Sequence, residues 1–427
     1  MILIHIPKYR TMDREIAIDI LMKYKQEQSY LNLTLNHVFS THSLTKESKS
    51  LITHLVYGTI QNQIYLEYML EPHLKSRVKS FEKILLLMSL YQHYFLDHIP
   101  DYAIVNEAVQ LAKKRKGMKT SKFINAVLKN ALSTSRSLDH LEERERLSIE
   151  TSHPSWMVKM LEKQYGLETT KKICYANNDI PYKTARVNTI KTTREKLLEN
   201  KLFEKGMLSE DALYYHGGNI AGTNEFKNGL VTIQDESSQM VARLLNPHPH
   251  DYVLDMCCAP GGKTAHLAAI MENQGKIDAY DLYEHKILLV NGLMERLGIE
   301  IVNVKCYDAT KLKNVYHGET FDKILLDGPC SGLGVLSRKP EIKYHNSSIM
   351  DKIIEIQREL LDNAYALLKN DGSMVYSTCT INKKENEKQI QWFIEKYPDM
   401  KVIKEMTILP YEYHSDGFYM CLLKKEY

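Results

Sequence analysis

Residues 252–273, YVLDMCCAPGGKTAHLAAIMEN, decide the fold of the C-terminal half of this chain. The first residues predict a strand that ends at Asp255, Pro-Gly-Gly predicts a tight turn, and the apolar spacing that follows predicts a helix. The stretch ends in Gly-Lys-Thr, as a P-loop does, but a P-loop needs a glycine where this chain has Cys257, and Pro260 removes an N–H donor. The dinucleotide pattern G-x-G-x-x-G is also absent from this stretch. Two interpretations of this stretch remain. It is either a ligand-binding loop for a ligand that lacks phosphate groups, or an ordinary turn between a strand and a helix.

Strands and helices alternate from about residue 228 onward. Apolar segments at 276–283, 302–309, 322–330 and 373–380 follow the first strand, each separated from the next by a helix-length stretch. This alternation predicts an α/β fold with a mostly parallel sheet and helices on both faces. In such sheets ligands bind at the carboxyl ends of the strands.

The earlier part of the chain has a different pattern. Residues 12–135 show helical spacing only, with one segment, 81–98, that is apolar on nearly every side. Between about 140 and 225, helices around a break at His153-Pro154 are followed by short β-like pieces. We therefore expect an all-α domain at 1–138, a small α+β subdomain at 139–225 and a catalytic α/β domain at 226–427.

Composition restricts the class of protein. The chain has 427 residues, 44% apolar and 26% charged, and a net charge of +3, which are ordinary globular values. The apolar run at 84–88 is far too short for a membrane span, and the opening MILIHIPKYRTMDRE is not typical of a signal peptide. Seven cysteines without a CxxC pair argue against disulfides or zinc, and His248 and His250 lack further ligands at suitable spacing. We expect a cytoplasmic protein with reduced thiols, no metal and no membrane partner.

Carboxylates follow the predicted strands. They are Asp255, Asp281, Asp308 and Asp327. Any one of them could simply cap a turn or a helix, but their recurrence at successive strand ends favours a binding site. Four acidic groups suit a cationic ligand such as S-adenosyl-L-methionine, which carries a sulfonium and an ammonium group and no phosphate. We assign the ribose of such a ligand to Asp281 and its adenine side to Asp308.

Two cysteines stand at the ends of the last two predicted strands, Cys330 after Asp327-Gly-Pro and Cys379 in VYSTCT. A single cysteine here could be an inert buried thiol. Two thiols and a carboxylate at neighbouring strand ends instead indicate covalent catalysis on an electrophilic ring.

The motifs DMCCAPGGKTAHLA (255–268), DGPCSGLGVLSRKPEIKY (327–344) and VYSTCTINKKENE (375–387) resemble those of RNA cytosine-5 methyltransferases that use two cysteines. The helical segments 55–70 and 99–113 are similar to a NusB-like RNA-binding domain. The combination resembles the bacterial 16S ribosomal RNA methyltransferases of the RsmB type. The resemblance therefore implies a Rossmann-like class I methyltransferase domain, S-adenosyl-L-methionine as cofactor and 16S ribosomal RNA as partner of a monomeric protein.

The resemblance also implies roles for individual residues. Cys379 would attack carbon 6 of cytosine, Cys330 would assist release of the adduct, and Asp327 would position the base and lie near the cofactor. The other residues expected at the cofactor are Cys257, Cys258, Ala259, Pro260, Gly261, Gly262, Lys263, Asp281 and Asp308. The basic run at Lys113, Lys114, Arg115 and Lys116, with Arg338 and Lys339 after the Pro-Cys motif, would contact RNA phosphates.

Two alternatives stay open from the sequence. The chain could methylate transfer RNA by the same chemistry, or it could be an RNA-binding assembly or antitermination factor with a silent methyltransferase fold. An unrelated enzyme acting with the same cofactor on proteins or small molecules would not need two facing cysteines.

Overall fold

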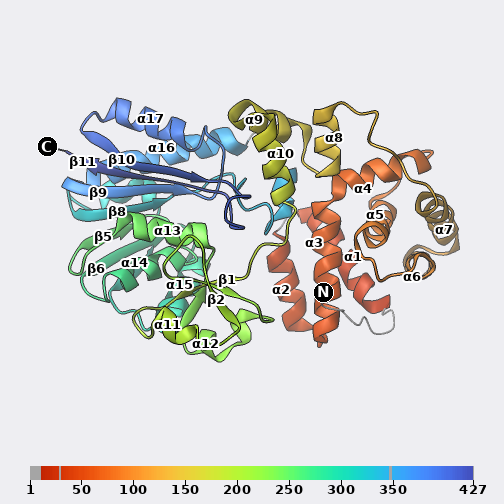
Figure 1. The fold of residues 1–427 in the computed structure, drawn as a ribbon, viewed down its shortest axis with the longest axis horizontal. Helices are drawn as coiled ribbons and strands as arrows, with labels where there is room; N and C mark the ends of the chain where they lie inside the picture. Colours follow the sequence, from red (N-terminus) through yellow and green to blue (C-terminus); the bar gives the residue numbers. More distant parts are fainter. Residues whose placement is uncertain (1–10, 28–29, 346–348, 427) are drawn as a thin grey trace. The chain divides into compact units, whose positions relative to one another are not determined.

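The computed structural model describes residues 11–27, 30–345 and 349–426, so the first ten residues of the opening segment lie outside the described residues. The chain divides into two compact units (Figure 1). One comprises residues 1–178 with 339–345, and the other residues 179–338 with 346–427. The boundaries expected at 138 and 225 do not coincide with these units, because residues 139–178 pack with the preceding helices.

The first unit is all-α, as its apolar spacing predicts. Its helices are α1 (Thr11–Glu27), α2 (Leu31–Thr41), α3 (Lys46–Gln61), α4 (Gln63–Leu70), α5 (Ser80–Phe95), α6 (Asp101–Lys116), α7 (Met118–Leu132), α8 (Glu143–Glu150), α9 (Ser155–Tyr165) and α10 (Leu167–Ala176). Phe81 and all nine residues from Ile84 to Gln92 of α5 are buried. A helix with apolar residues all round needs neighbours on every side, and α1, α3, α4, α6 and α7 supply them. In the described part of the chain, no helix is both long and apolar enough to cross a membrane.

A short segment from beyond the Pro-Cys motif belongs to this helical unit. It forms a 3₁₀ turn, Pro340–Tyr344, in which Lys343 is fully buried. The ammonium group of Lys343 donates to Asn178 Oδ1 at 2.8 Å and to the carbonyls of Gln61 and Thr151 at 3.3 Å. Burial lowers the pKa of Lys343 to about 7. The motif residues that precede this segment in the sequence gave no indication that it belongs to the helical unit.

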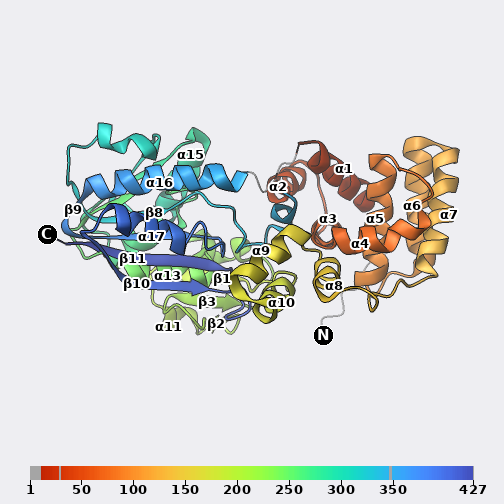
Figure 2. The ribbon, with the colours of Figure 1, turned by 90° about the horizontal axis from the view of Figure 1, so that it is seen from above.

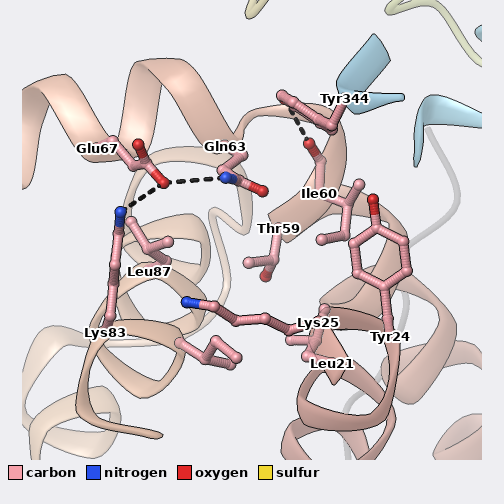
Figure 3. A pocket seen from close by; sticks show the side chains of 11 residues that line it. Leu21, Tyr24, Lys25, Thr59, Ile60, Gln63, Glu67, Lys83, Leu87 and Tyr344 are labelled. Carbon is pink, nitrogen blue, oxygen red and sulfur yellow. Dashed lines mark hydrogen bonds and ion pairs between the residues drawn. The ribbon is translucent and has the colours of Figure 1, made fainter. Parts of the chain in front are cut away.

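Tyr344, the last residue of that turn, lines a cavity of about 180 Å³ in the helical unit (Figure 3). Its hydroxyl donates to the carbonyl of Ile60 at 2.9 Å. Thr59 and Lys25 point into the cavity, whose opposite wall carries the ion pair between Lys83 and Glu67 (Figure 3). Among the described residues the Thr59 hydroxyl, although buried, has no hydrogen-bond partner.

The second unit begins with a small antiparallel sheet in the order β2-β3-β1-β4. Its strands are β1 (Thr184–Val187), β2 (Phe203–Lys205), β3 (Ala212–Tyr215) and β4 (Val231–Ile233), and the short helices α11 (Arg194–Leu197) and α12 (Asn224–Lys227) lie between them in sequence. The β-like pieces predicted near 185 and 213 are confirmed as β1 and β3. This subdomain and the main sheet form one compact unit.

The main sheet has seven strands in the order β10-β11-β9-β8-β5-β6-β7. The predicted parallel strands are confirmed as β5 (Tyr252–Asp255), β6 (Lys276–Asp281), β7 (Val302–Cys306), β8 (Phe321–Asp327) and β9 (Leu368–Thr378). Two long antiparallel strands, β10 (Met400–Ile408) and β11 (Phe418–Lys425), extend the sheet beyond β9 (Figure 2). The alternating pattern did not predict this pair.

Helices cover both faces of the main sheet, as expected (Figure 1). One apolar core joins the sheet to α16 (Ile349–Leu367) and α17 (Glu387–Lys396), and the other joins it to α13 (Glu236–Leu245), α14 (Gly262–Ile270) and α15 (Glu284–Leu297). The fold is therefore a Rossmann-like α/β domain preceded by a small antiparallel sheet and an all-α unit. Its parallel strands bring the chemical motifs to one edge.

Candidate active site

The turn after β5 is built around a buried carboxylate. Asp255 Oδ2 accepts the hydroxyl of Thr264 at 2.7 Å, and Oδ1 accepts the N–H of Cys257 at 3.3 Å. Burial raises the pKa of Asp255 to about 7. Gly261 has φ 101°, and a Cβ there would lie 3.1 Å from Val290 of α15. Asp255 thus holds the turn, while Gly261 supplies a backbone conformation that other residues rarely adopt.

Asp281 and Asp308 lie at the ends of the next two strands, where the sequence places them. Asp281 Oδ1 accepts the N–H of Tyr283 at 3.2 Å and is 3.3 Å from the ammonium of Lys286. Asp308 caps the following 3₁₀ turn through Thr310 and is 3.2 Å from the ammonium of Lys311. Three of the four strand-end carboxylates therefore have lysine partners, counting Asp327 below. The excess negative charge that four carboxylates led us to expect is largely compensated.

Lys263 and Asp327 form an ion pair between the glycine turn and the end of β8. Lys263 Nζ is 2.7 Å from Asp327 Oδ2 and 5.0 Å from the centre of the Phe418 ring. Asp327 Oδ1 accepts the hydroxyl of Ser377 at 2.8 Å. Burial opposes the charge on Lys263, yet its pKa lies above the ordinary value because Asp327 and then Cys379 favour the ammonium form. The lysine is thus a fixed positive charge beside the catalytic motifs.

The two motif cysteines meet at the ends of β8 and β9. The strands pair in parallel up to Asp327 opposite Ser377, so the residues that follow leave the sheet together. Cys330 Sγ lies 3.3 Å from Cys379 Sγ. A hydrogen bond to Cys379, with burial, raises the pKa of Cys330 well above that of an ordinary thiol. Two sulfur atoms this close can reach the same bound ring, and the raised pKa of Cys330 keeps its sulfur in the thiol form.

Glu385 joins the loops that carry the two cysteines, and sequence analysis assigned it no role. Its fully buried carboxylate accepts the N–H and hydroxyl of Ser331 at 2.8 and 2.6 Å and the amide of Asn382 at 2.9 Å. Ser331 also contacts the hydroxyl of Thr380 at 2.9 Å. Each cysteine is thus adjacent in sequence to a member of this network. Nothing in the local spacing indicated it, because its members lie about 50 residues apart.

The basic residues expected to contact RNA have protein partners instead of free charges in several cases. Arg338 donates to Asp416 at 2.8 Å and to Asp235 at 2.7 Å, so its guanidinium holds together loops of the second unit, which carries the two cysteines and is called the catalytic unit below. The ammonium of Lys339 lies 5.4 Å from the centre of the Tyr30 ring.

The basic run of α6 is partly engaged as well. Lys114 and Arg115 pair with Glu15, and Arg115 also pairs with Asp19. Lys113 and Lys116 are exposed in the last turn of the helix. Throughout residues 11–27, 30–345 and 349–426, no cluster of three or more His, Cys, Asp or Glu side chains could hold a metal.

The fold and the two facing cysteines define the class, a methyltransferase domain of the RsmB/F type joined to a helical domain of the NusB type. The family model 16S rRNA methyltransferase RsmB/F matches residues 242–424, the NusB family matches residues 11–133, and the ferredoxin-like domain of RsmF/B-like methyltransferases matches residues 153–216. The chain belongs to the ribosomal RNA small subunit methyltransferase B family. It is 41% identical to the probable ribosomal RNA small subunit methyltransferase B of Bacillus subtilis (strain 168), across 98% of this chain and 99% of that protein.

Solved structures show the same fold. The crystal structure of PH0851 has a TM-score of 0.84 and 24% identity, covering 98% of this chain and 99% of that one. A methyltransferase homolog protein from Pyrococcus horikoshii has a TM-score of 0.61 and 26% identity, covering 67% of this chain and 100% of that one. The family resemblance inferred from the motifs is confirmed.

Proposed function

We propose that this protein transfers a methyl group from S-adenosyl-L-methionine to carbon 5 of a specific cytosine in 16S ribosomal RNA, through a covalent bond between Cys379 and the base. The observation that carries the proposal is the 3.3 Å separation of the Cys330 and Cys379 sulfurs at neighbouring strand ends. The name of the family, and that of the Bacillus subtilis relative, support a ribosomal substrate.

The residues around the glycine turn fit a cofactor without phosphate groups. The Lys263 ammonium is bound to Asp327 and is not available to hold a triphosphate as a P-loop lysine does. The turn packs closely on α15 at Gly261, and Asp281 ends β6 where a carboxylate suits ribose hydroxyls. Residues Cys257 to Lys263, with Asp281, Asp308 and Asp327, would hold the cofactor. When bound, S-adenosyl-L-methionine supplies an electrophilic methyl group.

Cys379 would make the base reactive. Carbon 5 of cytosine is a weak nucleophile, and addition of a thiolate to carbon 6 converts the ring into an enamine that is reactive at carbon 5. The ammonium of Lys263 favours the thiolate form of Cys379, because the two groups attract each other. Asp327, anchored by Lys263 and Ser377, would accept a hydrogen bond from the amino group of the base, and one from nitrogen 3 once that nitrogen gains a proton as the adduct forms.

Release requires transfer of the carbon 5 proton to a base such as water; its bonding electrons re-form the ring double bond, the Cys379–carbon 6 bond breaks, and the sulfur leaves as a thiolate. Cys330 would assist this step from its position beside Cys379. Its raised pKa keeps a proton on its sulfur near the leaving thiolate, which stabilises that charge. The target base must leave its stack to enter a site between two strand ends.

Mapping of 5-methylcytosine tests the proposal. Ribosomal and transfer RNA would be compared from cells without the gene and from cells complemented with the wild-type chain, Cys379→Ala or Cys330→Ala. We expect one cytosine of 16S RNA to lose its methyl group and to regain it only with an intact Cys379. If the methyl group is lost from and restored to transfer RNA instead, transfer RNA replaces 16S RNA as the proposed substrate. Full methylation with Cys379→Ala would refute the covalent mechanism.

Trapping separates the roles of the two cysteines. RNA that carries 5-fluorocytidine at the mapped position should form a stable adduct, since the fluorine on carbon 5 cannot leave as a proton does. We expect an adduct with the wild-type chain and none with Cys379→Ala. With ordinary RNA, Cys330→Ala should accumulate an adduct that the wild-type chain releases. If no variant affects methylation anywhere but loss of the gene impairs subunit assembly, the binding-factor alternative replaces the enzyme.

A further inference from the structure

Two exposed aromatic rings stack on each other in the catalytic unit. Tyr182 precedes β1, and His414 lies in the loop between β10 and β11. Their ring centres are 4.8 Å apart with an interplanar angle of 22°. Tyr182 is 42% exposed and His414 is also exposed, whereas Tyr214, which meets Tyr182 edge-on at 5.0 Å, is buried. The buried Tyr214 packs against Tyr182 from the protein interior, and the Tyr182–His414 pair remains exposed to solvent.

Arg338 holds the two loops that carry these rings. Its guanidinium donates to the carbonyl of Tyr182 at 3.3 Å and to Asp416, two residues after His414, at 2.8 Å. The same guanidinium binds Asp235, whose carboxylate also accepts the N–H of Asp416 at 3.1 Å. A planar guanidinium with several fixed donors suits this role, because it orients each partner. The ring pair is therefore pre-organised.

The same loop reaches the catalytic cysteine through the backbone. The N–H of Gly417 donates to the carbonyl of Gly334 at 2.7 Å, and the N–H of Gly334 donates to the carbonyl of Cys379 at 3.0 Å. A Cβ at Gly334 would lie 1.8 Å from the Gly417 carbonyl, so this close approach requires glycine. His414 is three residues from Gly417, and extended chain spans at most about 11 Å over three residues. The His414 backbone therefore lies within about 11 Å of Gly417, which is bonded to the segment that in turn bonds to Cys379, and this connection suggests a contact with a nucleotide that flanks the target cytosine.

We propose that the Tyr182–His414 pair is a stacking platform for the unpaired RNA base adjacent to the target cytosine. The inference rests on the proposed function, since it names a second contact of the same RNA. Extrusion of one base leaves its neighbour without a stacking partner, and aromatic side chains bind such bases by their faces. Stacking tolerates any base, so the platform would contribute affinity and position the strand rather than select a nucleotide.

Binding measurements test the platform without depending on methylation. The probe is unmodified 16S ribosomal RNA made by transcription, titrated with the full-length chain. We expect Tyr182→Leu, which keeps apolar volume but removes the ring, to weaken binding about 5- to 150-fold, the range produced by loss of one stacked base. Tyr182→Phe should bind as the wild type does. His414→Asn, which tolerates the left-handed backbone at φ 51°, should weaken binding to a smaller extent. Tyr175→Leu, which removes in the same way a ring that is 48% exposed on α10, is the control.

A fluorescent base distinguishes stacking from a structural role of the loop. A fragment around the mapped cytosine would carry 2-aminopurine at the adjacent position, whose emission falls when it stacks on an aromatic ring. The wild type and Tyr182→Phe should quench it, and Tyr182→Leu should not, while the rate at saturating RNA changes less than the KM. If Tyr182→Leu binds RNA and quenches the fluorescent base as strongly as the wild type does, the stacking platform is refuted and the methylation proposal stays intact. If no RNA is methylated by the wild type, the proposed function fails, and the transcript titration alone decides whether Tyr182 binds RNA.

Discussion

Acid should destabilise the catalytic unit through His266, a histidine of α14 that is 2% exposed. Its Nε2 lies 2.8 Å from Asp211 Oδ2, and Arg243 binds the same carboxylate at 2.7 and 2.6 Å. Burial, with repulsion from Arg186, lowers the pKa of His266 to about 4 although Asp211 opposes the shift. Between pH 6.5 and 4 the unfolded chain therefore binds a proton that the folded chain does not. The contribution of neutral His266 to the free energy of unfolding is complete above pH 6.5 and is lost as the pH falls toward 4.

The size of the effect follows from the two pKa values. With 6.5 for the unfolded chain and about 4 for the folded chain, linkage predicts a loss of about 2 kcal/mol in the free energy of unfolding between pH 7.5 and 5. The limit, reached below pH 4, is about 3.4 kcal/mol. Asp211 does not contribute in this window. Burial opposes its charge, but hydrogen bonds from His266 and Arg243 hold its pKa below the ordinary value, so it remains ionised.

Urea unfolding at pH 5, 6 and 7.5, followed by circular dichroism, measures the effect. His266→Gln keeps an N–H at the position of Nε2 but cannot be protonated. We expect the variant to lose about 2 kcal/mol less than the wild type between pH 7.5 and 5. His153, buried in the helical unit with a lowered pKa, contributes equally to both proteins and cancels in the difference. Equal losses in the two proteins would refute the assignment.

Three further outcomes are expected. The free energy of unfolding of the wild type should rise by about 2 kcal/mol between pH 7 and 9, because the pKa of Lys343 is about 7 in the folded chain and the unfolded chain keeps its proton over this range. Lys343→Met should lack this rise in the same urea titrations. Thr59→Val removes a buried hydroxyl without a described partner (Figure 3), so the thermal midpoint should stay or rise; a fall would show that the hydroxyl is bonded. Glu385→Gln should slow single-turnover methylation about 10- to 100-fold at unchanged RNA affinity, because it loosens the loop of Cys330; an unchanged rate would remove Glu385 from the positioning network.

Much of the fold could be predicted because its signals are local. The helical spacing around α5, the break at His153-Pro154 and the five apolar segments of the parallel sheet are all visible within short windows. Which segments pair or pack with one another could not be predicted as readily. Strand β10 carries exposed and half-buried residues along most of its length, so it lacks a buried-strand pattern, and β11, although mostly buried, pairs with it antiparallel outside the alternation of strands and helices. Segment 339–345 continues a catalytic motif in sequence but packs among helices.

The sequence indicated which carboxylates and cysteines follow the strands, but not how the charge of the carboxylates is balanced. Carboxylates at strand ends were correctly placed, yet Lys263, Lys286 and Lys311 compensate three of them. Arg338, expected at an RNA phosphate, is bound by two carboxylates that lie 78 and 103 residues away in sequence. Pairing of this kind depends on distances in space, which spacing along the chain does not report.

Local sequence patterns specified the helices of the first unit, the five parallel strands and the two motif cysteines, because apolar periodicity and motif residues are properties of neighbouring positions. Contacts in the folded chain place the two sulfurs 3.3 Å apart, tie their loops together through Glu385 and stack Tyr182 on His414. These contacts join residues 49, 54 and 232 positions apart in sequence. They form because parallel pairing and buried hydrogen bonds bring distant loops to the same edge of the sheet.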